Sequence, residues 1–146
     1  MPHAPPLMQC DGAQGTLPAM DNRLLESLMA TGNHWRKIIN CAAKTAFLWQ
    51  PKGYQTWQNY RDDFLLRANS RQFLHWGYCD VHALAGIKII TGKQHGQNLL
   101  GPVWQEGDFY LEAEQGIIVS PYFDYRQLSN LKIQQLVDYL QSLNPA

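Results

Sequence analysis

The sequence predicts an α/β fold, specifically a three-layer α/β/α sandwich with a short, mainly parallel central sheet. Two patterns support this prediction. Apolar residues recur at helical spacing in the first half of the chain, and four strand-length runs alternate with helical segments in the second half. The run Ile-Ile-Val at residues 117–119 is typical of a strand buried on both faces, as the inner strands of a parallel sheet are.

The length of 146 residues fits one domain with a core of useful size. Residues 1–20 contain four of the eight prolines together with Gly12 and Gly15, so we expect an irregular, proline-rich arm there. Residues 21–146 are expected to form the single α/β domain.

Three helices are predicted in the first half of the chain. They span residues 21–32, 34–49 and 54–66. Asp21 or Asn22 is expected to cap the first helix and Gly32 to end it, while Asn33 is expected to cap the second. The second helix has one broad apolar face, made by Trp35, Ile38, Ile39, Ala42, Ala43, Ala46 and Phe47.

Strand-length runs dominate the second half. The predicted strands span residues 73–76, 87–91, 108–113 and 116–120, each bounded by Gly, Asp or Pro. A short helix is expected over residues 92–101, between the second and third strands. The last helix is predicted over residues 131–143, with one apolar face made by Ile133, Leu136, Val137 and Leu140.

The charge balance argues against any overall attraction to polyanions. Twelve basic and twelve acidic residues cancel, and the sequence pI is about 6.9, so binding of nucleic acid would need a local basic patch. No apolar run reaches the roughly 18 residues needed to span a bilayer, so we expect no membrane association and a cytoplasmic location.

The cysteines predict reduced thiols, because Cys10, Cys41 and Cys79 are odd in number and far apart. The segment HWGYCDVH, residues 75–82, holds His and Cys side chains, but no second ligand cluster accompanies it. We therefore expect neither a metal nor a cofactor.

Aromatic and charged side chains follow the last predicted strand, in the segment SPYFDYR at residues 120–126. The pair Gly92-Lys93 follows the strand at 87–91 in the same way. Because the carboxyl ends of neighbouring parallel strands meet at one edge of a sheet, we expect both segments to line one ligand site. The predicted ligand-binding residues are Gly92, Lys93, Pro121, Tyr122, Asp124, Tyr125 and Arg126.

Two interpretations of this strand exit are open. The side chains of Tyr122, Asp124, Tyr125 and Arg126 could stack on a nucleobase and bond its edge. Alternatively, Tyr122 or Phe123 packs under the following helix, Asp124 caps it and Arg126 pairs with a carboxylate.

Three segments in this order carry a resemblance to a known family. NHWRKIINCAAKTAF and IKIITGKQHGQNLLG are similar to the Asn-x-Phe-Trp-Lys helix and the strand-Gly-Lys-x-helix segment of mismatch-specific uracil/thymine-DNA glycosylases. The strand with SPYFDYR resembles the superfamily's His-Pro-Ser or Asn-Pro-Ser loop. One register sets Ser120, Pro121, Tyr122 and Arg126 on that loop, and another sets Asp124 on its Asn. The resemblance implies a trimmed uracil-DNA glycosylase fold.

The chain departs from that superfamily before residue 33. No early strand leads into a Gly-x-Asp-Pro or Gly-x-Asn-Pro loop, whose Asp or Asn handles the attacking water in the family. The resemblance therefore implies a binding domain with lost or altered catalysis, whose ligand is a nucleobase, a nucleotide or DNA. An active DNA glycosylase and a protein-interaction module are the alternatives.

Overall fold

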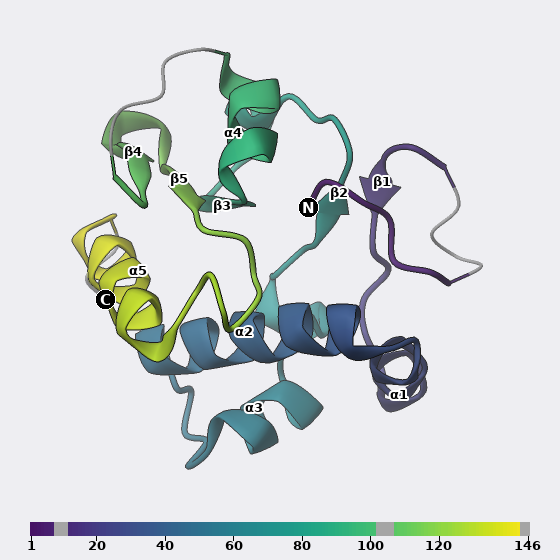
Figure 1. Cartoon of the computed structure of the whole chain (residues 1–146). Coiled ribbons are helices and arrows are strands. Elements are labelled where there is room, and N and C mark those ends of the chain that lie inside the picture. Colours follow the sequence, from purple (N-terminus) through teal and green to yellow (C-terminus); the bar gives the residue numbers. More distant parts are fainter. Residues whose placement is uncertain (8–11, 102–106, 144–146) are drawn as a thin grey trace.

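The computed structural model describes residues 1–7, 12–101 and 107–143, and it confirms the α/β class (Figure 1). The described residues form five α-helices and two small sheets. The helices are α1 (Asn22–Ala30), α2 (Asn33–Trp49), α3 (Trp57–Asp63), α4 (Lys93–Leu100) and α5 (Asn130–Leu143). The strands are β1 (Gly15–Thr16), β2 (His75–Trp76), β3 (Lys88–Thr91), β4 (Tyr110–Glu112) and β5 (Ile117–Ser120).

The helix ends follow local side-chain chemistry in most places. The Asp21 carboxylate accepts the Leu24 N–H at 2.7 Å and so caps α1, as predicted. The prediction of Asn33 as the cap of α2 is wrong, because Gly32 occupies that position at φ 136° and Asn33 is already helical. The third helix is shorter than expected, because the Thr56 side chain caps its start by accepting the Asn59 N–H, and Phe64 leaves helical geometry at a φ of −124°.

The central sheet has three strands in the order β3-β5-β4, and it is mixed rather than mainly parallel. β3 runs parallel to β5, but β4 runs antiparallel to it. The prediction of a mainly parallel sheet is therefore wrong for one of the two pairings. The cause is the connection from Glu112 to Ile117: a single 3-10 turn is too short for the crossover that parallel neighbours require, so the chain must fold back as a hairpin.

The strand expected at residues 73–76 does not join the central sheet. Its last two residues form β2, which pairs with β1 from the proline-rich arm, with Gly15 opposite Trp76. A Cβ atom on Gly15 would lie 2.5 Å from Trp76 Cζ2, so only glycine allows the indole to pack against this strand. Leu17 and Met20, also in the arm, are buried in the main core. The described parts of the arm therefore belong to the packed structure.

Helices lie on both faces of the central sheet (Figure 1). Ile118 of β5 joins the larger core, which includes Trp35 of α2 and Leu136 of α5. Its neighbours Ile117 and Val119 point the other way and pack with a smaller cluster that includes Leu99 of α4. Among the residues described, no helix has the length and apolar character needed to cross a membrane.

Candidate functional site at the strand exits

The carboxyl ends of β3 and β5 lie side by side, so Gly92 and Pro121 leave the sheet at one rim. Thr91 is in register with Ser120, and the Gly92 N–H donates to the Ser120 carbonyl at 2.8 Å. The prediction that both segments emerge at a common edge is confirmed. The Gly92 N–H is used in this bond, however, and is not free to receive an anion. Lys93, the first residue of α4, is exposed just beyond it.

Tyr122 covers this rim and ties it to α2. A Cβ on Gly92, whose φ is 96°, would lie 3.3 Å from Tyr122 Cδ2, so the ring and the turn are in close contact. On its other side Tyr122 stacks on His34, with ring centroids 5.7 Å apart, and its hydroxyl is hydrogen-bonded to His34 Nε2 at 3.0 Å. Burial, followed by the nearby Asp124 charge, raises the pKa of Tyr122.

Asp124 closes the turn that leads into α5. Its carboxylate accepts the Arg126 backbone N–H at 3.0 Å, and its carbonyl accepts the N–H groups of Gln127 and Leu128. That backbone bond, together with Lys37 at 3.6 Å, lowers the pKa of Asp124. Phe123 is buried beneath the turn. The structural interpretation of the segment is therefore met in part: Phe123 is buried and Arg126 pairs with a carboxylate, but Asp124 caps the turn at Arg126 and does not cap α5, where Ser129 Oγ accepts the Lys132 N–H.

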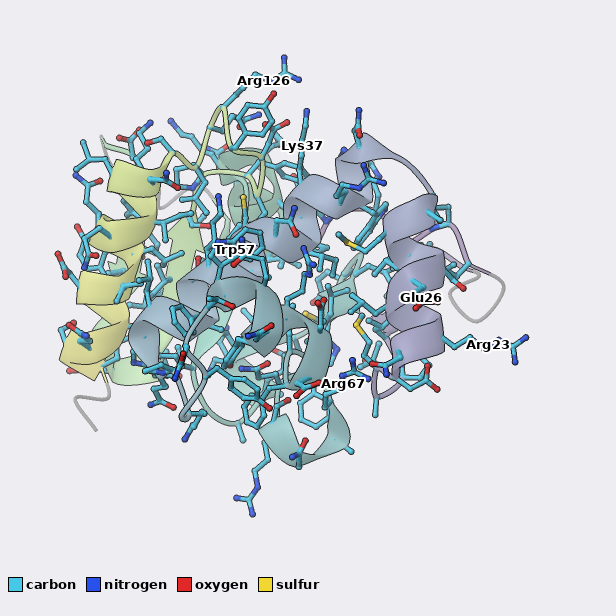
Figure 2. The ribbon with its side chains drawn as sticks, turned by 90° about the horizontal axis from the view of Figure 1, so that it is seen from below. Arg23, Glu26, Lys37, Trp57, Arg67 and Arg126 are labelled. Atoms are coloured by element: carbon cyan, nitrogen blue, oxygen red, sulfur yellow. The ribbon has the colours of Figure 1, made fainter. Side chains whose placement is uncertain are left out.

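Tyr125 and Arg126 face solvent, while the neighbouring Lys37 side chain is only 20% exposed. Tyr125 is 58% exposed. The Lys37 ammonium lies 4.9 Å from its ring centroid, and the Arg126 guanidinium lies 5.8 Å from it and also 3.7 Å from Asp124. We call Lys37, Asp124, Tyr125 and Arg126 the Tyr125 surface. Lys37 and Arg126 are both labelled on the face seen in Figure 2.

The predicted site residues thus divide into two groups. Gly92, Pro121 and Tyr122 form a packed rim, with Lys93 exposed just beyond it. Asp124, Tyr125 and Arg126 form a second group farther along the loop, in which Asp124 is half-buried and the other two are exposed. The sequence does not predict that Lys37 belongs to this surface, because Lys37 and Tyr125 are distant in the chain. Basic and aromatic residues alternate around Trp35, and this is the one sequence feature that points to Lys37 as a surface residue of interest. The pattern does not show which side chains Lys37 contacts.

His95, in the first turn of α4, is a buried titratable group near the rim. Burial, and then the Met1 amino group and His3, lower the pKa of His95 to about 4, so the imidazole is neutral at pH 7. The Thr91 hydroxyl, at the end of β3, donates to the Met1 sulfur at 2.8 Å. The first residues of the arm therefore fill the space beside the rim. In the described part of the chain, no group of three or more His, Cys, Asp or Glu side chains could hold a metal ion.

The fold and the strand-exit loop define a small mixed α/β domain with a solvent-facing tyrosine that lies close to two cations. Residues 1–141 match the model of a family of unknown function (DUF6942), and the chain belongs to that family. Neither the curated proteins nor the solved structures include a match to it.

The resemblance to the uracil-DNA glycosylase superfamily is wrong, because the family match covers nearly the whole chain and places it elsewhere. The segments that carried the resemblance are short. Many unrelated proteins have a Gly-Lys turn or a proline where a strand ends and a helix follows. These features therefore indicate a strand-to-helix connection and do not identify a family.

Proposed function

We propose that the Tyr125 surface binds a phosphate-bearing ligand, either a nucleotide or a strand of nucleic acid. The observation that carries the proposal is the placement of Lys37 and Arg126 against one exposed tyrosine ring. An ammonium and a guanidinium at such a site supply charge-assisted donors for phosphate oxygens, and the guanidinium plane or the ring edge can contact a base.

The electrostatics of the surface support this class of ligand. Asp124 is the one carboxylate within ion-pair distance of Lys37 and Arg126 in the described residues, so the two cations exceed it by one charge. Arg126 is held loosely, since its side chain is 70% exposed. Because the whole chain has no net charge, binding here depends on this local excess and not on a general attraction.

The test is a binding titration of labelled single-stranded DNA and RNA, and of free nucleotides, at several salt concentrations. Arg126→Ala should weaken binding and reduce the slope of log K against log salt by about 0.7–0.9, the value for one phosphate contact. Tyr125→Ala should weaken binding at every salt concentration, because it removes the platform that holds both cations.

Arg23→Ala is the matched control, because Arg23 is an exposed arginine on α1 that projects away from this surface in Figure 2. It should leave the affinity and its salt dependence unchanged. The proposal fails if no nucleotide or oligonucleotide binds at low salt, or if Arg23→Ala weakens binding as much as Arg126→Ala. A partner captured with a flat salt response would identify the surface as a protein-interaction site.

A further inference from the structure

A second feature of the molecule lies two helical turns along α2 from the Tyr125 surface. It is a hollow of about 270 Å³ between α2, α3 and the start of α5, which we call the Trp57 hollow. Its lining residues are Lys44, Phe47, Leu48, Trp57, Asn130 and Ile133. Leu48 is 47% exposed at its edge, while Ile133 is buried at its base. Most of the lining is therefore apolar carbon that faces open solvent.

Two cations lie against the Trp57 ring that lines this hollow. The Lys44 ammonium lies 5.1 Å from the Trp57 ring centroid, and the Arg61 guanidinium lies 5.4 Å from the same ring. α5 begins at Asn130 with no acidic residue in its first turn, so the positive end of its dipole also faces the hollow. None of the lining residues carries a carboxylate, and no described carboxylate forms an ion pair with Lys44.

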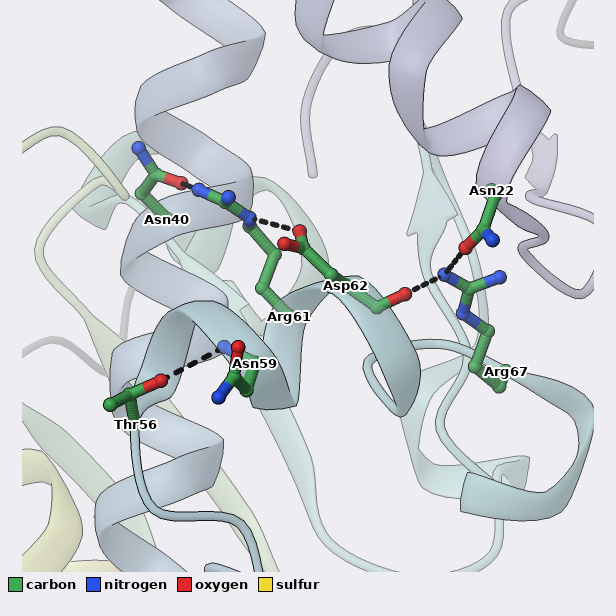
Figure 3. A network of polar contacts seen from close by, with 7 residues as sticks. All are labelled: Asn22, Asn40, Thr56, Asn59, Arg61, Asp62 and Arg67. Atoms are coloured by element: carbon green, nitrogen blue, oxygen red, sulfur yellow. Dashed lines mark hydrogen bonds and ion pairs between the residues drawn. The ribbon is translucent and has the colours of Figure 1, made fainter.

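Polar contacts hold α3, which carries Trp57, against its neighbouring helices (Figure 3). Arg61 donates to Asn40 of α2 at 3.0 Å, which holds α3 against α2, and it also donates to Asp62 within α3 at 2.8 Å. Arg67 binds the Asn22 side chain at 2.8 Å and also the Asp62 carbonyl, which fixes the far end of α3 to α1. Asp62 partly compensates Arg61, so Lys44 is the main cation open to a partner.

We propose that the Trp57 hollow is a docking site for an acidic, amphipathic segment of a partner protein. One large apolar side chain of that segment fills the hollow against Phe47, Leu48 and Trp57, and a carboxylate close to it in the chain pairs with Lys44. The volume lies just below the roughly 300–1,000 Å³ of sites that enclose small molecules, which favours an inserted side chain over a metabolite. Charge complementarity selects the acidic segment.

The experiment is selection of binders from a random peptide library displayed on phage, with the whole chain as bait. Enriched sequences should combine a large apolar residue with Asp or Glu within about one helical turn of it. Labelled copies of the best binders are then titrated against variants. Leu48→Glu and Lys44→Glu should each weaken binding by at least about tenfold, as loss of a central contact or its charge partner does.

Tyr125→Ala is the matched control, because it alters the neighbouring surface and leaves the hollow intact. Leu48 is half exposed, so Leu48→Glu should fold, and its unfolding curve checks this. Peptide binding that is lost in Leu48→Glu and kept in Tyr125→Ala supports the proposal. An absence of enriched acidic-apolar peptides overturns it, and so does equal binding by all variants. Loss of oligonucleotide binding in Leu48→Glu overturns it as well, because the hollow would then belong to a nucleic-acid path.

Discussion

The Tyr125 surface and the Trp57 hollow are built from the same kind of contact, yet they offer different chemistry. Lys37 and Lys44 are seven residues apart on α2, so they lie on one stripe of the helix, two turns from each other. Each lies against an aromatic ring that an arginine also contacts. Tyr125 stands on an exposed loop beside a carboxylate, whereas Trp57 lines a hollow with apolar walls.

The difference shows that surroundings, more than the cation–π pair itself, decide what a surface can bind. Lys37 and Tyr125 lie beside Asp124 and are part of a polar network, whose electrostatic strength falls with added salt. Lys44 and Trp57 lie beside the apolar side chains of Phe47 and Leu48. The free energy gained by burying that apolar surface is insensitive to moderate salt. Ligand binding at the two sites should therefore respond differently to ionic strength.

The largest expected effect is a difference in stability between a variant at the base of the Trp57 hollow and a variant at its edge. Ile133 is buried in the core, so Ile133→Ala should reduce the free energy of unfolding by about 2–4 kcal/mol. Leu48→Ala, at the exposed edge, should change it by less than about 0.5 kcal/mol. Denaturant unfolding measures both. Comparable losses would mean that Leu48 is part of the core and unavailable to a partner.

The next effect concerns the rim beneath the Tyr125 surface. Gly92→Ala places a Cβ 3.3 Å from Tyr122 at a φ of 96°, which should destabilise the fold by about 1–3 kcal/mol. Gly53→Ala is the matched control, because Gly53 has a φ of 86° but no atom within 4 Å of the added carbon. The excess cost at Gly92 measures the contact with Tyr122. If the two costs are equal, Tyr122 does not constrain the turn.

A smaller effect tests the polar network through its pH dependence. The pKa of Asp124 is lower in the folded state than its ordinary value of about 3.9, so its contribution to stability is complete above that value. The contribution is lost as the pH falls through the folded pKa. Asp124→Asn should therefore cost about 0.5–1 kcal/mol at pH 7 and progressively less below about pH 4. A constant difference between pH 7 and pH 3, measured by unfolding, contradicts this role.

The smallest effect compares the two lysines directly. Lys37→Met and Lys44→Met each remove a cation from an aromatic ring, at a cost of about 0.5–1 kcal/mol in stability. Lys37→Met also removes the pairing with Asp124, so it should cost slightly more at low salt. At about 1 M salt the two costs should converge. A difference that persists at high salt would show that the Asp124 pair is not the cause.

The sequence by itself determined the elements whose signals are local. The apolar faces of α1, α2 and α5 repeat every turn, and β5 is a run of β-branched residues, so each is readable without knowledge of its neighbours. The common rim of Gly92 and Pro121 followed from the parallel pairing of β3 with β5. The hairpin of β4 and β5 is also encoded locally, in the shortness of its connection, although the strand runs alone favour a mainly parallel sheet.

Only the tertiary structure decided which distant segments meet. Glycine is unfavourable in strands, yet Gly15 and Thr16 form one because they pair with β2 and Trp76 packs against Gly15. Tyr122 meets His34 across 88 residues, and the Trp57 hollow joins three helices. Local periodicity shows that a face is buried but not what buries it. The position of a solvent-facing cation depends on packing between whole elements, which a short stretch of sequence does not encode.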